Sequence, residues 1–116
     1  GLRIVGEPLF RSNAALFGRP NAGDQPELQI LRSRIEGRLV ALNYMMVEYD
    51  CPGAILAQAT RLTPGLESPT ITPLQREGWL SVKAMINKHE ANRIMDELSR
   101  LGARGILLTK IETARI

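Results

Sequence analysis

The order of two residue periodicities between positions 43 and 112 constrains the fold most. Residues 79–86 (WLSVKAMI) alternate strictly, so Leu80, Val82, Ala84 and Ile86 face one way, which predicts a strand with one buried face. Residues 87–101 then predict a helix, because Asn87 can cap it, Glu90 stands where a capping box places its carboxylate, and Gly102 can end it. Its buried face is predicted to hold Ile94, Met95, Leu98 and Leu101.

The segments around this pair complete a regular order. Residues 43–50, 69–74 and 104–112 are predicted strands, and residues 52–62 are a predicted short helix that begins at a proline. The succession strand, helix, strand, strand, helix, strand predicts an α+β domain with a ferredoxin-like βαββαβ arrangement. In such a fold a four-stranded antiparallel sheet carries both helices on one face.

Upstream of residue 43 the pattern is weaker. Apolar residues recur every three or four positions at Leu28, Leu31, Ile35 and Leu39, which predicts a connector helix over residues 26–42. Residues 2–5 and 14–17 resemble two short β segments, and residues 18–25 (GRPNAGDQ) are dense in turn formers. We therefore expect a boundary near residue 24, with residues 1–24 ending one unit and residues 25–116 forming the connector helix and the ferredoxin-like domain.

Composition excludes several functional classes. A chain of 116 residues has room for one domain, and its 15 basic residues are spread among 12 acidic ones without forming a basic stripe. Aromatic residues make up only 4%, too few for the stacking platforms of single-strand and RNA binders, so a nucleic-acid partner is not expected. No apolar run approaches the ~18 residues that span a bilayer. No membrane partner is expected, and the single cysteine suits the cytoplasm.

Residues that could carry out catalysis are scarce. His89, the only imidazole, lies among polar neighbours at a helix start and is interpreted as a solvated residue. Cys51 precedes a helix start but has no partner histidine, so we interpret it as structural. No glycine-rich phosphate loop and no spaced set of Asp, Glu and His suggests a phosphate or metal site. We therefore predict no catalytic residue, no metal ligand and no cofactor in this chain.

Polar residues and glycines gather at the ends of the predicted strands. Asp50 stands where the first strand stops, residues 64–70 (PGLESPT) lead into the second, and Gly105 lies at the start of the last. A carboxylate, a hydroxyl and close-approach glycines could hold a small amine-bearing molecule. The alternative is that Pro64 and its neighbours simply shape the crossover between helix and strand. From the residues alone this alternative is favoured.

Several runs together resemble a known family. PGLESPTITPL at residues 64–74, GW at residues 78–79 and LGARGIL at residues 101–107 resemble the C-terminal domain of long-form ATP phosphoribosyltransferase, the first enzyme of histidine biosynthesis. VGEPLF at residues 5–10 is similar to the last strands of that family's catalytic region, and RSRIEGRL at residues 32–39 to the helix that leaves it. YDCP and IMDEL are similar to actinobacterial members in particular.

The resemblance implies a feedback sensor. Free L-histidine would bind this domain and inhibit the condensation of ATP with phosphoribosyl pyrophosphate in the catalytic part. It also implies a homohexamer for the intact enzyme, with sensor domains meeting around symmetry axes. The ligand contacts that the resemblance implies fall on Asp50, Leu66, Thr70, Met85 and Gly105. Gly105 stands where relatives carry alanine, so its contact would come from the backbone.

The family's phosphate-binding segment and its Mg²⁺ chemistry lie upstream of residue 1. The start at Gly1, without an initiator Met, is interpreted as a cut within a longer protein. ATP and phosphoribosyl pyrophosphate would therefore be partners only of the missing part. Two alternatives remain: a ferredoxin-like oligomerisation module without a small ligand, and an RNA-binding module on the same fold.

Overall fold

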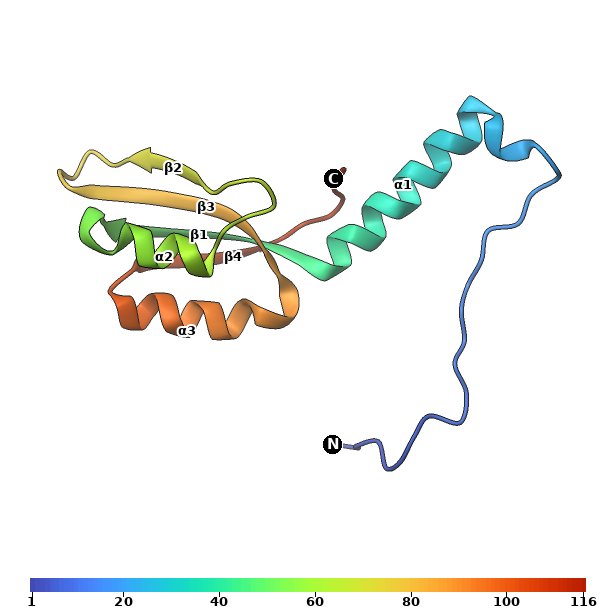
Figure 1. The fold of residues 1–116 in the computed structure, drawn as a ribbon, viewed down its shortest axis with the longest axis horizontal. Helices are drawn as coiled ribbons and strands as arrows, with labels where there is room; N and C mark the ends of the chain where they lie inside the picture. The colour runs from blue at the N-terminus through green and yellow to red at the C-terminus, as the bar shows by residue number, and fades with distance from the viewer.

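The computed structural model describes all 116 residues, and its centre is a four-stranded antiparallel sheet with strand order β2-β3-β1-β4 (Figure 1). The strands are β1 (Tyr44–Pro52), β2 (Thr70–Pro73), β3 (Trp79–Asn87) and β4 (Arg104–Lys110). β1 and β3 pair along their whole lengths, from Tyr44 opposite Asn87 to Pro52 opposite Trp79. The α+β, ferredoxin-like prediction is confirmed.

Two helices cover one face of this sheet. They are α2 (Leu56–Leu62), preceded by the 3₁₀ turn η2 (Gly53–Ile55), and α3 (Ala91–Leu101), preceded by the 3₁₀ turn η3 (Lys88–Glu90). α3 ends as predicted, because Gly102 adopts a left-handed φ of 102° and its N–H donates to the carbonyl of Ser99.

The predicted capping box at the start of α3 is wrong in one respect. The Asn87 side chain does accept a hydrogen bond, from the N–H of His89 at 3.0 Å. The η3 turn intervenes, however, so Glu90 becomes the residue that precedes α3. Its carboxylate pairs with Arg93 at 2.7 Å and does not return to the Asn87 N–H.

The core lies between the sheet and the two helices. Val47, Tyr49 and Cys51 alternate along β1 and meet Ala59 of α2 and Leu98 of α3. The other buried residues of this core are Val82, Ala84, Ile86, Ala91, Ile94 and Ala103. Of the predicted inward-facing residues, Val82, Ala84, Ile86, Ile94 and Leu98 are confirmed in the core and Leu101 packs against it. Leu80 and Met95 are only half-buried and lie outside the core cluster.

One polar pair completes this core. The Thr63 hydroxyl is fully buried and donates to the Ala59 carbonyl at 3.2 Å. Because the hydroxyl has only one proton, the Tyr49 O–H donates to Thr63 Oγ1, at 2.8 Å. The pair ties the last turn of α2 to the middle of β1 without leaving a buried polar atom unsatisfied.

The long helix α1 (Pro26–Asn43) runs away from the sheet and enters β1 directly (Figure 1). Its existence is confirmed, but the predicted apolar face is largely uncovered: Leu31, Ile35 and Leu39 are exposed. The residues that α1 buries are Gly37 and Ala41.

Residues 1–21 form no strand, so the two predicted β segments at 2–5 and 14–17 are wrong for this chain. The apolar side chains of Leu2, Val5 and Phe17 are exposed. The physical reason is that a strand needs a partner edge, and none faces these residues. The first regular structure is the 3₁₀ turn η1 (Ala22–Asp24). No helix anywhere in the chain combines the length and apolar character that crossing a membrane requires.

Candidate ligand site on the open face of the sheet

The face of the sheet opposite α2 and α3 carries no helix, and we call it the open face. Side chains alternate across a strand, so the residues between the core positions point to it. Cross-strand pairs confirm the assignment: Asp50 opposes Ser81, Glu48 opposes Lys83, and Thr70 opposes Lys83 from the other side. The open face comprises Met46, Glu48, Asp50, Thr70, Thr72, Ser81, Lys83, Met85, Arg104, Gly105, Leu107 and Thr109, with Arg104 opposite Asp50.

Asp50 and Gly105 lie together at one end of this face. The register between β1 and β4 shifts between Glu48 and Asp50, as in a β-bulge. Gly105 lies in that irregularity with a φ of +57°, which glycine adopts at little cost. A side-chain carbon added there would stand 3.6 Å from Asp50 Oδ2. The backbone around Gly105 thus approaches the carboxylate closely.

Thr70 and Met85 lie further along the same face. Thr70 opens β2 opposite Lys83, and Met85 follows Lys83 by two positions, on the same side of β3. Leu66 is four residues before Thr70, in the loop after α2, and its side chain is exposed. Gly65 beside it has a φ of +71°, and the Ser68 backbone would meet an added side chain there at 3.1 Å.

Asp50 and Gly105, at one end of the open face, are separated from Met85 of the same protomer. Asp50 is level with Ser81 of β3, and Met85 is four residues further along that strand. At ~3.4 Å per residue this amounts to roughly 14 Å. The ion pair between Lys83 and Glu48 occupies the row between them. Thr70, opposite Lys83, lies level with that row. Asp50 and Met85 of the same protomer therefore stand at opposite ends of this part of the open face.

Cys51 lies directly behind this site. It follows Asp50 in β1 but points into the core, where it is fully buried. Burial raises the pKa of its thiol, and the neighbouring Asp50 carboxylate raises it further. The thiol stays protonated near neutrality, which agrees with its interpretation as a structural residue.

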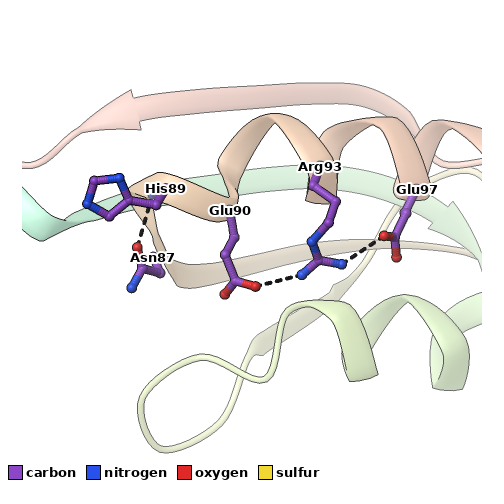
Figure 2. A network of polar contacts seen from close by, with 5 residues as sticks. All are labelled: Asn87, His89, Glu90, Arg93 and Glu97. Atoms are coloured by element: carbon purple, nitrogen blue, oxygen red, sulfur yellow. Dashed lines mark hydrogen bonds and ion pairs between the residues drawn. The ribbon is translucent and has the colours of Figure 1, made fainter. Parts of the chain in front are cut away.

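His89 takes part in the turn at the start of α3. The backbone N–H of His89 donates to the Asn87 side chain. Arg93 donates to Glu90 and Glu97, each at 2.7 Å. The His89 imidazole points away from Glu90, Arg93 and Glu97 (Figure 2). The Glu90 and Glu97 carboxylates raise the pKa of the exposed Arg93 guanidinium. No group of three or more His, Cys, Asp or Glu side chains is arranged to hold a metal ion.

Three features of the molecule could not be predicted from the sequence. Alternation alone places Glu48 and Lys83 on some exposed face, but only the β1–β3 register makes them partners. The bulge at Gly105 also depends on register, although a glycine inside a strand pattern is its usual signal. A wide hollow of about 1110 Å³ lies elsewhere, between residues 16–25 and the first turns of α1, and none of the five predicted ligand residues lines it.

Comparison with known proteins agrees with this architecture. The family described as "HisG, C-terminal domain" matches residues 41–113. The ATP phosphoribosyltransferase of Salinispora tropica is 48% identical over 116 residues, covering all of this chain and 41% of the relative. That of Streptomyces avermitilis is 48% identical over 120 residues, covering all of this chain and 42% of the relative.

The ATP phosphoribosyltransferase of Corynebacterium kroppenstedtii is likewise 48% identical over 116 residues, covering all of this chain and 41% of the relative. The chain therefore spans about two-fifths of the length of the relatives it matches. The family match at residues 41–113 includes the whole sheet domain, and the similarity to these actinobacterial enzymes extends over the entire chain. This chain belongs to the ATP phosphoribosyltransferase family and carries the family's C-terminal domain.

Proposed function

We propose that this chain is the histidine-binding regulatory part of an ATP phosphoribosyltransferase. The observation that carries the proposal is the open face, where the predicted residues Asp50, Thr70, Met85 and Gly105 all lie on the side of the sheet that no helix covers. A site there is accessible to a ligand and to a second copy of the sheet.

Each residue has a chemical role toward L-histidine. The Asp50 carboxylate accepts hydrogen bonds from the ammonium or imidazole group of the ligand, and such charge-assisted bonds are the strong ones. The Thr70 hydroxyl donates or accepts a further bond. Leu66 and Met85 supply apolar walls, and Gly105 contributes its backbone.

The separation of Asp50 from Met85 is the reason for proposing a site shared between two protomers. Because Asp50 and Met85 of one protomer lie roughly 14 Å apart along the sheet, we propose that Asp50 and Gly105 of one sheet meet Leu66, Thr70 and Met85 of a neighbouring sheet. Histidine would then bridge two subunits. In a hexamer this bridge stabilises one arrangement of the regulatory domains over another, and a ligand shifts such an equilibrium by its differential affinity.

The reaction itself belongs to the upstream part of the protein. The condensation of ATP with phosphoribosyl pyrophosphate, together with the Mg²⁺ expected for it, is proposed for the residues that the relatives have and this chain lacks. Residues 1–24 are proposed to be the end of that catalytic part, and residues 25–116 the regulatory part. A cytoplasmic location follows from this proposed role.

The test substitutes Asp50 in the complete enzyme that contains this chain. Asp50→Ala should weaken inhibition by histidine by about 10- to 100-fold, because it removes a charged acceptor worth ~1.5–3 kcal/mol. Turnover without histidine should be unchanged. Asp96→Ala is the matched control, since Asp96 is an exposed carboxylate on α3, away from the open face.

Titration calorimetry of the complete enzyme with L-histidine accompanies these assays. The absence of any heat and of any inhibition in the unsubstituted enzyme would refute histidine sensing. Equal loss of turnover and inhibition in Asp50→Ala would assign Asp50 a structural role instead.

One alternative has an observation in its favour. Leu107, at the centre of β4 on the open face, is 59% exposed, as expected for a surface that pairs with another copy whether or not a ligand is present. A pure oligomerisation module predicts the same hexamer with and without histidine. Sedimentation velocity distinguishes the two, because the histidine-bridged form should sediment faster as it becomes compact.

A further inference from the structure

The segment that follows β4 crosses α1 and is bonded to it. The Ala114 N–H donates to the Gly37 carbonyl at 3.0 Å, and the Arg38 side chain donates to the Glu112 carbonyl at 2.7 Å. We call residues 112–115 the strap. These two hydrogen bonds connect parts of the chain more than 70 residues apart in sequence.

Gly37 is the point of closest approach. It is buried although most of α1 is exposed. A side-chain carbon added at Gly37 would stand 2.6 Å from the Ala114 carbonyl oxygen and 2.8 Å from Thr113 Oγ1. Glycine is a poor helix former, so its presence in the middle of α1 needs a reason. Contact with the strap is that reason, because any larger residue must displace a backbone group.

The strap attaches α1 to the sheet at a second point. The first point is covalent, since Asn43 of α1 is followed at once by Tyr44 of β1. Gly37 is six residues earlier, roughly 9 Å along the helix axis. α1 also contacts the η3 turn, and Ala41 near its end is buried. The strap adds a contact at Gly37, further from the Asn43–Tyr44 junction, and so further restricts the direction of α1. In Figure 1 the end of the chain lies beside the half of α1 that is nearer the sheet.

The same strap continues the strand that begins at the candidate site. β4 starts next to Asp50, at Arg104 and Gly105, and ends at Lys110, two residues before the strap. A shift of β4 therefore reaches α1 through a short segment that bends at Glu112. From α1 the chain continues upstream toward the part that the relatives have in addition.

We propose that the strap couples the ligand site on the open face to the upstream part of the enzyme by making α1 and the sheet move as one body. This inference rests on the proposed histidine-sensing function. Gly37, Ala114 and Arg38 are positioning residues in it and do not touch the ligand. When histidine binding rearranges the sheet domains, α1 moves with its own sheet. Its direction relative to the upstream part of the enzyme then changes.

The test uses Gly37→Ala and a chain that stops after Ile111. Gly37→Ala should improve the helix while expelling the strap, and the shortened chain removes the strap without changing α1. Gly23→Ala is the matched control, because an added side-chain carbon there meets nothing within 4 Å. Hydrogen exchange of the Ala114 amide reports the strap itself and should become fast in Gly37→Ala but not in Gly23→Ala.

The functional measurements are made in the complete enzyme that contains this chain. Both strap variants should bind L-histidine with unchanged affinity by calorimetry, keep their turnover without histidine, and retain about tenfold more turnover than the unsubstituted enzyme at saturating histidine. Unchanged inhibition in both variants, with fast exchange at Ala114, overturns the coupling and leaves histidine sensing intact. A tenfold loss of affinity in both overturns it too, since the strap would then belong to the site. If the unsubstituted enzyme binds no histidine, the sensing function fails first.

Discussion

The sheet domain from β1 to β4 and the region before it contain similar fractions of apolar residues. The sheet domain buries them in one core, whereas the region before it leaves most of them exposed. Between residues 44 and 110 the apolar side chains alternate into one core, and Val47, Val82 and Leu98 are fully buried. Before β1 the large apolar side chains are uncovered: twelve of the chain's sixteen exposed large hydrophobic residues lie there. An apolar pattern predicts which face a segment will bury, but burial itself requires a second surface.

The difference also separates two kinds of stabilising contact. The sheet domain is held by long-range strand pairing and by one core, so its parts depend on one another. α1 is held mainly by its own helical hydrogen bonds, by exposed pairs such as Arg32–Glu36, and by the strap. Substitutions should therefore cost much in the first region and little in the second.

The largest contrast is expected between two leucines. Leu98→Ala removes a fully buried side chain from the centre of the core and should lower the free energy of unfolding by about 2–5 kcal/mol. Leu9→Ala removes a side chain that is 95% exposed and should change it by less than about 0.5 kcal/mol. Urea unfolding of residues 1–116, followed by circular dichroism, measures both. Similar costs for the two would erase the distinction between the regions.

A second test uses alkaline pH, which should act on the sheet domain alone. Burial raises the pKa of Tyr49 and of Cys51 above their ordinary values of 10.0 and 9.0. The folded state therefore keeps these protons longer than the unfolded chain does. The stabilisation is complete below about pH 9 and is lost as pH rises through the folded-state values.

The free energy of unfolding should therefore be level from pH 7 to about pH 8.5 and fall above about pH 9. Tyr49→Phe should flatten the decline above pH 10, at a cost of about 1 kcal/mol at neutral pH for the lost bond to Thr63. Leu9→Ala should follow the unsubstituted protein at every pH. An undiminished alkaline decline in Tyr49→Phe would show that other groups cause it.

The smallest effect is expected on α1. Glu36→Gln removes the partner of Arg32, whose side chain is 74% exposed while that of Glu36 is 56% exposed. Pairs of this spacing on a helix surface contribute about 0.3–0.5 kcal/mol, so unfolding should change by no more than that. Helicity measured by circular dichroism at low and high salt checks it. A cost above about 1 kcal/mol would mean that Glu36 has a tertiary role.

Much of the sheet domain could be predicted because its signals are local. The alternation at residues 79–86 and the helix ended by Gly102 both depend on residues within one or two turns of each other. The β segments at residues 2–5 and 14–17 could not be judged in this way, because a strand forms only where another strand offers an edge. The burial of the apolar face of α1 could not be predicted either, because it requires a second surface to pack against.

The candidate site was predicted only in part. Asp50, Thr70, Met85 and Gly105 were identified as its members by resemblance, and the strand period implies that they share one face. The separation of Asp50 from Met85 follows from the β1–β3 register, in which Asp50 is level with Ser81 and four positions from Met85, and Thr70 lies level with Lys83 between them. No local pattern in the sequence encodes that separation.

By itself the sequence determined the family and, within the sheet domain, the order of the elements and most of the residues that each buries. These depend on side-chain periods and capping residues, whose physics acts within a few positions. Only the tertiary structure decided that Tyr49 meets Thr63, that the Asp50 group stands apart from Met85, and that the strap rests on Gly37. Each of those contacts joins distant segments, so it depends on the folded register and packing of the whole chain.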